Sequence, residues 1–468
     1  MKSRRHSAIS SAVVQQNDPI FAGILIQWHN LTQSEKVVCS CIFLVPLWWL
    51  WGWSYLAVFL AISVFAYQYF HKGSLHLQKP SVFVIAGIAY GLHELLSISF
   101  WAIYNNYSLN PRSFTNSITT WIAPLFLLWY IKSYRIKVRP QVIAWAFSVV
   151  VFQMLLFWVV IHFAWKENFY IPPRSLFGLL TGKGEVFVPG VGNSNFLMPY
   201  FPSDSSLLGM VRYVFFFHGP ESLALVVGFG CILAVDIQQK FWSIILFSGS
   251  FFLLLLSGTR STWLAIPAVL IIRWLLTISK NGKLWRMFAL LAIVSFVTLS
   301  IPAVTDLFSN SATHTAKATG EFRGDSTEVR AEIYRRTWEG FINGSDTQLI
   351  FGHIVSGETV LPGYAPAVVG SHSFLLSTLL YRKGLLGTAI FLTFWISLIS
   401  WLYATRKSRP MSCLIVYVLF SLTFSVMEWE SVVMPIILIT SVTHNPTLQI
   451  PKSKHDFKAL SLKSIIEF

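Results

Sequence analysis

The sequence predicts an all-α polytopic membrane protein with about twelve transmembrane helices. Of its 468 residues, 54% are hydrophobic and only 12% are charged, which is about half the charged fraction of an average soluble protein. The mean hydropathy is +0.59. Apolar runs close to the roughly 20 residues that cross a bilayer as a helix recur from residue 37 to residue 443. Repeated runs of this length exclude a soluble multidomain chain.

Hydropathy and length locate the individual helices. The predicted spans are 37–53, 54–70, 81–103, 117–131, 141–165, 213–235, 241–257, 261–279, 286–306, 385–403, 411–427 and 431–443. Two long polar segments interrupt them. The predicted division is a cytoplasmic segment 1–36, transmembrane helices in 37–165, an extracytoplasmic segment 166–212, transmembrane helices in 213–306, a second extracytoplasmic segment 307–371, transmembrane helices in 372–443 and a cytoplasmic tail 444–468.

The positive charges decide the predicted orientation. The net charge is +15, and 22 Lys and Arg residues fall in the segments predicted to be cytoplasmic, whereas the short outer loops hold only Arg112 and Arg260. Lys and Arg accumulate in the cytoplasmic loops of membrane proteins, so the basic balance needs no nucleic-acid partner. Both termini are therefore predicted to be cytoplasmic, and both long segments are predicted to lie outside.

Two further features bound the class of protein. The first span starts near Val37, which is too late for a typical signal peptide, so we expect an uncleaved anchor. The four cysteines, Cys39, Cys41, Cys231 and Cys413, all lie within apolar runs. We expect buried thiols there, with neither a disulfide framework nor a metal site.

A few Lys, Arg and His residues lie on the predicted outer face, although Lys and Arg usually accumulate in cytoplasmic loops. Arg260 lies in a minimal outer turn, and Arg330 lies in the second long segment, which His372 closes. Arg382 and Lys383 follow His372 about ten residues later. Residues 372–384 are expected to form a helix at the level of the outer headgroups, because 385–403 is long enough to span the membrane alone.

These residue types suit a phosphorylated lipid. The fork of an Arg side chain binds phosphate oxygens in pairs, and two such side chains stabilise a diphosphate as a leaving group without a metal. A histidine beside them takes a proton from an attacking hydroxyl, since its ordinary pKa lies near 6.5. The pattern predicts group transfer from a lipid diphosphate to a hydroxyl acceptor, with no metal and no cofactor.

Three ordered motifs resemble a known family. "LLLLSGTRSTWLAIPAVLII", "STEVRAEIYRRTWEGF" and "SHSFLLSTLLYRKGLLG" are similar to the blocks of the O-antigen ligase and polymerase superfamily, in the same order, over roughly residues 210–405. The resemblance implies a GT-C-like membrane fold and a metal-independent glycosyltransferase of the bacterial cytoplasmic membrane. It implies a glycan donor linked to undecaprenyl diphosphate and a hydroxyl-bearing acceptor on the outer face, for cell-surface polysaccharide biosynthesis, with 307–371 as the catalytic loop.

The resemblance also implies roles for single residues. Arg260 and Arg330 fall at the diphosphate-binding arginines of the family, and His372 falls at its catalytic histidine. Arg212 and Glu221, the latter in "HGPE", loosely match an upstream Arg…Pro-Asn element in which Glu221 replaces Asn. Arg382 and Lys383 stand where the family often has an acidic residue. Together with Arg212 and Glu221 they are candidates for substrate binding.

Each candidate has a structural alternative. Interfacial arginines anchor helix ends, and a lone histidine often caps a helix. Glu332 with Arg335 and Arg336 is compatible with ion pairs on a solvated helix. At the level of the whole protein, a flippase or transporter and a structural scaffold of an export complex remain alternatives. The sequence does not separate a ligase from a polymerase, since both need the same donor chemistry.

Overall fold

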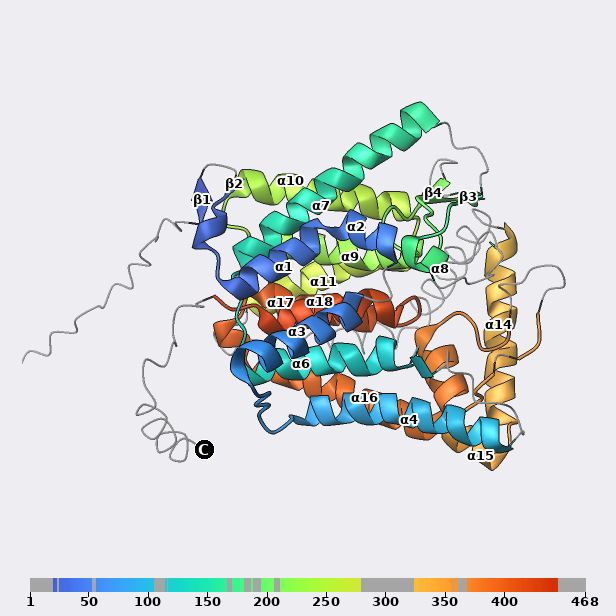
Figure 1. The fold of residues 1–468 in the computed structure, drawn as a ribbon. Helices are drawn as coiled ribbons and strands as arrows, with labels where there is room; N and C mark the ends of the chain where they lie inside the picture. The colour runs from blue at the N-terminus through green and yellow to red at the C-terminus, as the bar shows by residue number, and fades with distance from the viewer. Residues whose placement is uncertain are drawn as a thin grey trace, which may run out of the picture.

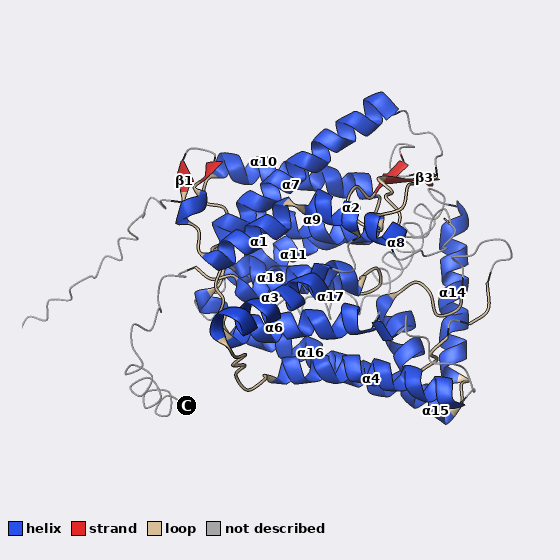
Figure 2. Ribbon diagram, viewed as in Figure 1, coloured by secondary structure: helices blue, strands red, loops and turns tan. Residues whose placement is uncertain are grey.

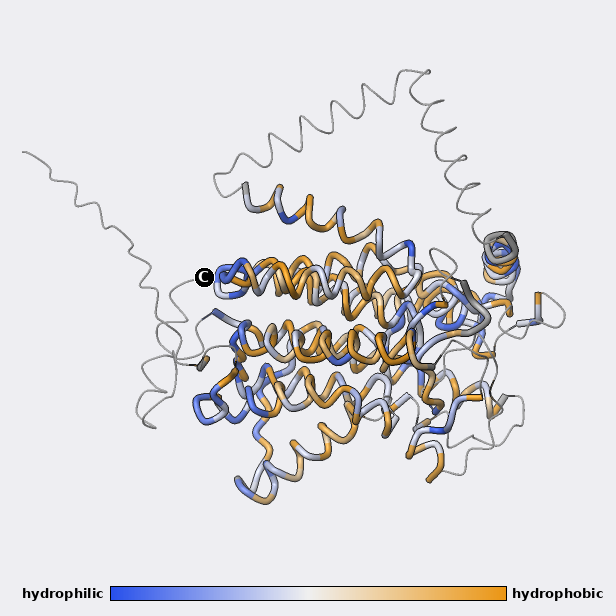
Figure 3. The backbone as a smooth tube through the Cα atoms, turned by 90° about the horizontal axis from the view of Figure 1, so that it is seen from above, coloured by the Kyte–Doolittle hydropathy of each residue, from blue (hydrophilic) through white to orange (hydrophobic). Residues whose placement is uncertain are grey.

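The computed structural model of the chain is mostly helical (Figure 2). It describes residues 20–22, 25–52, 56–104, 114–115, 117–165, 171–180, 187, 195–205, 211–278, 324–355, 357–360 and 368–444. Long helices run side by side in a bundle, and α14 (Gly324–Ile342) lies across one end of it (Figure 1). Apolar residues fill the length of the helices, while polar residues gather at the two ends of the bundle (Figure 3).

Twelve helices form the bundle in the described residues. They are α1 (Gln33–Phe43), α2 (Val45–Trp51), α3 (Leu56–Lys72), α4 (Val82–Tyr104), α6 (Ala123–Ser133), α7 (Pro140–Val160), α9 (Pro220–Ala234), α10 (Lys240–Ser257), α11 (Arg260–Ile278), α16 (Arg382–Ala404), α17 (Met411–Leu422) and α18 (Trp429–Ser441). The π-helical turns η3 (Ile118–Ile122), η4 (Ile161–Trp165) and η7 (Phe374–Tyr381) extend α6, α7 and α16.

The remaining elements are short. They are the antiparallel pair β1 (Phe21–Ala22) and β2 (Leu25–Ile26), the 3-10 turns η1 (Trp28–Asn30) and η8 (Arg406–Ser408), the helices α8 (Leu176–Leu180) and α15 (Asp346–Phe351), and the antiparallel pair β3 (Tyr200–Ser205) and β4 (Val211–Tyr213). In β3 and β4, Tyr200 pairs with Tyr213 and Phe201 pairs with Arg212.

The structure does not confirm the predicted number of spans. In the described part of the chain, five helical stretches are long and apolar enough to cross a membrane, or six when the bent pair of α1 and α2 counts as one. The structure therefore supports an all-α membrane protein but does not confirm twelve spans. A helix occupies every predicted range except 286–306, which lies outside the described residues, as do most of the N-terminal segment and the tail beyond residue 444.

Local chemistry explains why several predicted spans are short or broken. The range 37–53 is divided at Leu44, where α1 and α2 meet at 63°. Pro46 lies in the first turn of α2, a position where its missing N–H costs no helical hydrogen bond. The range 213–235 begins late because residues 211–213 form β4, and Pro220 opens α9. Hydropathy alone detects neither break.

Three of the segments predicted to be cytoplasmic, 1–36, 132–140 and 404–410, meet at one end of the bundle through their described residues. The Nη2 of Arg139 lies 2.7 Å from Oε2 of Glu35, a carboxylate that is fully buried. Val138 bridges to Val442, and Nη1 of Arg409 donates to the carbonyl oxygen of Val442 at 2.8 Å. Buried charges require such partners, so these contacts fix α1, α7 and the end of α18 together.

An aromatic core joins four elements inside the bundle. The ring of Phe391 in α16 lies 5.4 Å from Tyr90, 5.7 Å from Trp395, and 6.1 Å from both Trp121 and Trp429, measured between ring centroids. Aromatic pairs of this kind contribute about 0.5–1.5 kcal/mol beyond their buried area. They tie α4, η3 and α18 to α16.

A helix is present in the range predicted at the headgroups, 372–384, where η7 covers Phe374–Tyr381. The 31-residue helical stretch from Phe374 to Ala404 is interrupted at Gly384, whose φ of +65° and ψ of −172° are not helical. A Cβ at Gly384 would lie 2.4 Å from the carbonyl oxygen of Ile350. Glycine therefore permits both the interruption and the close approach of α15 to α16.

Candidate functional site

A cavity of about 340 Å³ lies at the end of the bundle that α14 crosses. It is lined by Arg212, Glu221, Gly258, Thr259, Arg260, Ser261, Arg330, Ala331, Tyr334 and Val426. Four of the seven residues singled out in the sequence thus share one cavity, although they come from β4, α9, α11 and α14. We call it the arginine cavity.

The turn between α10 and α11 forms one wall. Gly258 ends α10 in the left-handed conformation with φ +66°, and the hydroxyl of Thr259 donates to the carbonyl oxygen of Pro220 at 3.2 Å. Arg260 is the first residue of α11. A helix N-terminus attracts anions and disfavours cations. Arg260 at this position therefore adds a fixed positive charge where the helix already favours an anion.

Arg212 links three elements behind this wall. The side chain is buried; its Nε donates to the carbonyl oxygen of Ser257 at 3.0 Å, and its Nη2 lies 3.0 Å from Oε1 of Glu221. These contacts join β4 to α9 and to the end of α10. The cavity contains three arginines and one glutamate, which leaves an excess of positive charge.

The face of α14 that meets the cavity carries Arg330 and Tyr334, which are one helical turn apart. The neighbouring Arg335 and Arg336 each lie 2.7 Å from a carboxylate oxygen of Glu332. Hydrogen bonds from Arg335, and then from Arg336, lower the pKa of Glu332 to about 2. These two arginines form the solvated ion pairs that the sequence allowed, whereas Arg330 faces the cavity. Tyr334 had no signal in the sequence beyond its spacing from Arg330.

His372 lies on a strained segment just before η7. Gly370, His372 and Ser373 all have positive φ, at +79°, +56° and +72°. Non-glycine residues adopt this conformation at a cost of roughly 1–2 kcal/mol each. Strain of this kind persists only where the surroundings impose it, and it concentrates at functional sites.

Side chains from both sides hold this segment. The N–H of Gly370 donates to the buried Thr337 hydroxyl at 3.0 Å, and Nε of Arg382 donates to the Gly370 carbonyl oxygen at 3.1 Å. The Ser377 hydroxyl contacts the carbonyl oxygens of Ser371, at 2.6 Å, and of His372. Thr337 belongs to α14, so the helix that carries Arg330 also holds the segment that carries His372.

His372 does not line the arginine cavity, but it lies within the field of its charges. Partial desolvation, followed by the positive charge of Arg330, holds the pKa of His372 below its ordinary value, while Glu221 opposes the shift. The side chain as a whole remains exposed. An exposed imidazole with a lowered pKa is neutral near pH 7 and is able to accept a proton.

The structure does not bring Arg382 and Lys383 to the cavity. Nζ of Lys383 lies 3.0 Å from Oε1 of Glu94 in α4, and both side chains are mostly buried. Arg382 bonds the segment before His372 through Gly370. The contact of Lys383 joins α16 to α4, and the contact of Arg382 stabilises the segment that carries His372.

A second polar group lies beside the cavity and was not assigned from the sequence. Nε2 of His218 lies 2.7 Å from Oε2 of Glu428, whose carboxylate also accepts from Ser222; Ser431 donates to Ser222 at 2.7 Å. Desolvation alone lowers the pKa of His218, but the Glu428 carboxylate outweighs it and raises the pKa to about 9. Glu428 is more than 200 positions away in the chain, so local patterns do not reveal this pair.

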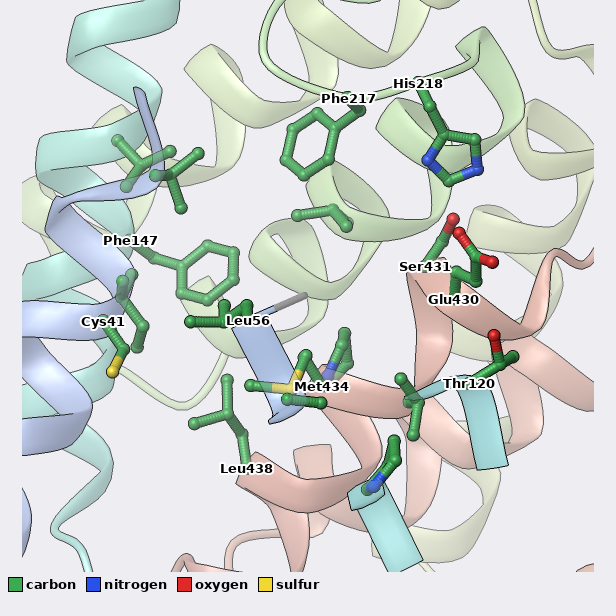
Figure 4. Close-up of a pocket in the computed structure, with 18 of the residues that line it drawn as sticks. Cys41, Leu56, Thr120, Phe147, Phe217, His218, Glu430, Ser431, Met434 and Leu438 are labelled. Atoms are coloured by element: carbon green, nitrogen blue, oxygen red, sulfur yellow. The ribbon is translucent and has the colours of Figure 1, made fainter. Parts of the chain in front are cut away.

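His218 also lines an apolar cavity of about 120 Å³, whereas Glu428 does not (Figure 4). Apolar side chains of α1, α3, α7 and α18 line it, and His218, Glu430 and Ser431 form its polar side. His218 lines the apolar cavity and Glu221 lines the arginine cavity. The two cavities therefore adjoin at the start of α9.

Comparison with known protein families gives a match to part of the chain that lines the arginine cavity. Residues 244–345 match a family model described as O-antigen ligase, whereas no curated protein matches the chain. The matched range contains Arg260 and Arg330. It begins after Arg212 and Glu221 and ends before His372, so the match covers two of the three sequence motifs.

Proposed function

We propose that this chain is a membrane glycosyltransferase using a lipid-linked glycan, because residues 244–345 match a family model described as O-antigen ligase, which supports the O-antigen ligase superfamily. In this proposal the donor is a glycan on undecaprenyl diphosphate, and the acceptor is a hydroxyl of a lipid or a growing glycan. The observation that carries the proposal is the arginine cavity, where Arg212, Arg260 and Arg330 from three separate elements meet. Such convergence of fixed positive charge suits an anionic group.

The diphosphate occupies the arginine cavity. Arg260 and Arg330 bind its oxygens, and the N-terminus of α11 adds a favourable field. Glu221 holds Arg212 in place through their 3.0 Å ion pair. The arginines stabilise the negative charge that develops on the leaving diphosphate, which lowers the barrier without a metal.

Transfer is a single displacement. The acceptor oxygen attacks the anomeric carbon while its proton passes to His372, and the bond between that carbon and the diphosphate oxygen breaks. The products are the new glycosidic bond, the free lipid diphosphate and a protonated His372. Attack opposite the leaving group inverts the configuration of the anomeric carbon.

The site faces the outside of the bacterial cytoplasmic membrane in this proposal, with both termini cytoplasmic. Two facts support it. The loops 132–140 and 404–410, which are predicted to be cytoplasmic, lie at the end of the bundle where Arg139 and Arg409 make their contacts, and the arginine cavity lies at the end crossed by α14. The polymerase and the ligase reactions share this chemistry and differ only in the acceptor.

Purified protein in nanodiscs tests the proposal. The donor is an oligosaccharide on undecaprenyl diphosphate, and the assay measures both glycan transfer and released undecaprenyl diphosphate, with a chelator present. We expect activity in the wild type and in Arg335→Ala, and strong losses in Arg260→Ala and His372→Ala. Full activity in His372→Ala contradicts the proposed base. Movement of the donor across the bilayer with no release of undecaprenyl diphosphate favours the flippase alternative.

A further inference from the structure

Two contacts of the Ser371 hydroxyl bear on the tautomer of His372. The Oγ of Ser371 bonds the carbonyl oxygen of Val368, and it also lies 2.8 Å from Nδ1 of His372. A carbonyl oxygen only accepts hydrogen bonds, and a serine hydroxyl has one hydrogen to donate. That hydrogen is therefore directed to Val368, and Ser371 offers a lone pair to His372.

The contact with His372 must then run from the ring to the hydroxyl. Nδ1 carries the hydrogen and donates it to Oγ of Ser371. A neutral imidazole has one N–H, so the lone pair of the ring resides on Nε2. The contact is also satisfied when the ring is protonated, because Nδ1 donates in both states.

The backbone around Ser371 makes this arrangement rigid. The N–H of Ser371 donates to the same Val368 carbonyl at 3.0 Å, so two groups of one residue hold that oxygen. Val369 is fixed in turn by its N–H bond to Glu358 at 3.0 Å and by the N–H of Gly357, which donates to its carbonyl oxygen at 3.0 Å. The hydroxyl therefore has a defined place beside the imidazole.

We propose that Ser371 is a positioning residue that holds His372 in the Nδ1–H tautomer, so that Nε2 takes the proton of the acceptor hydroxyl. This rests on the proposed function. In the step, the O–H bond of the acceptor breaks, its hydrogen moves to Nε2, and its electron pair forms the bond to the anomeric carbon. The carbon–oxygen bond to the diphosphate breaks with its electrons on the diphosphate. The resulting imidazolium keeps its Nδ1–H bond to Ser371.

The test compares Ser371→Ala, Ser371→Thr and Ser373→Ala with the wild type. Ser371→Thr keeps the hydroxyl, and Ser373→Ala removes a neighbouring hydroxyl that bonds the N–H of Leu376 instead. The readouts are kcat, the KM for the donor, and the pH midpoint of the limb where His372 gains its proton. Among the described residues, the charges that act on this ring are Arg330 and Glu221, and all the variants retain both.

We expect Ser371→Ala to lose about tenfold in kcat, the size of one net hydrogen bond, with an unchanged KM for the donor. Its pH midpoint falls, because the lost acceptor stabilised the imidazolium more than the neutral ring. Ser371→Thr restores both values, and Ser373→Ala leaves the midpoint unchanged. The midpoint does not depend on the fraction of folded protein, so poor folding of Ser371→Ala does not obscure it.

Two results overturn the proposal. One is a wild-type kcat and midpoint in Ser371→Ala. The other is a lower kcat with an unchanged midpoint that Ser371→Thr does not rescue, which indicates a purely structural role. His372→Ala is measured in the same series. If it retains activity, the proposed function fails, a result distinct from a failure of the Ser371 proposal.

Discussion

Replacing Arg330 and Arg335 separately by alanine gives a matched pair on one helix. Arg330 lines the arginine cavity, whereas Arg335 lies 2.7 Å from both Glu332 and Glu339 on the exposed side of α14. Both changes remove the same charge and the same side chain from the same helix. The difference between the two variants therefore reports the place of the side chain and not the loss of charge in general.

The expected magnitudes are far apart. Removing one preorganised donor to a developing anion costs about 2.7–4 kcal/mol, or 10²–10³-fold in rate, and we expect a loss of this size for Arg330→Ala. Exposed ion pairs contribute little, so Arg335→Ala is expected to stay within about twofold of the wild type. Single-turnover transfer with saturating donor measures both. Equal losses in the two variants, or no loss in Arg330→Ala, would refute the assignment of the diphosphate to this cavity.

Three further predictions concern stability in detergent, measured as melting temperature. Gly384→Ala is expected to be destabilised by at least about 1–3 kcal/mol, since its Cβ would meet the backbone oxygen of Ile350 at 2.4 Å. Gly73→Ala is the control, because Gly73 has the same φ of +65° but open space around it. A similar loss in Gly73→Ala would attribute the effect to the backbone conformation alone. Lys383→Met and Glu94→Gln should each destabilise the protein, because each leaves a mostly buried charge unpaired. The double variant should recover stability and retain transfer. Additive losses in the double variant would argue against the ion pair. Because the folded-state pKa of His218 is raised to about 9, its stabilising contribution is complete below about pH 6.5 and is lost as the pH rises through 9. His218→Gln should therefore lower the melting temperature most at pH 6 and least above pH 9, and a pH-independent difference would contradict this.

The sequence predicts helix positions well but span lengths less well. Hydropathy places a helix in every range that the structure describes, because the apolar run itself is the signal. It misses the bend at Leu44 and the late start of α9, which depend on Pro46, on β4 and on Pro220. It also separates 372–384 from the following span, and the non-helical backbone of Gly384 lies at that boundary.

The site was predictable where local motifs carry it. Arg260 and Arg330 stand in motifs, and both line the cavity; the weaker candidates Arg212 and Glu221 line it too. Arg382 and Lys383 carry the same charge in the sequence, but their partners, Gly370 and Glu94, are set by tertiary packing.

The pair of His218 and Glu428 is a polar contact that the sequence did not predict, because tertiary packing forms it. Two elements distant in the chain place these side chains 2.7 Å apart, and no spacing rule connects them. Ser371 is adjacent to His372, yet its role depends on the direction of a hydrogen bond to Val368 that only the folded backbone defines.

The central claim is that the arginine cavity binds the diphosphate of a lipid carrier. The most direct test is the affinity of the nanodisc-embedded protein for undecaprenyl diphosphate, compared among wild type, Arg260→Gln and Arg335→Gln. We predict that Arg260→Gln weakens binding at least about tenfold, as expected for a lost charge-assisted hydrogen bond, while Arg335→Gln binds as the wild type does. Equal affinity of Arg260→Gln and the wild type would contradict the account.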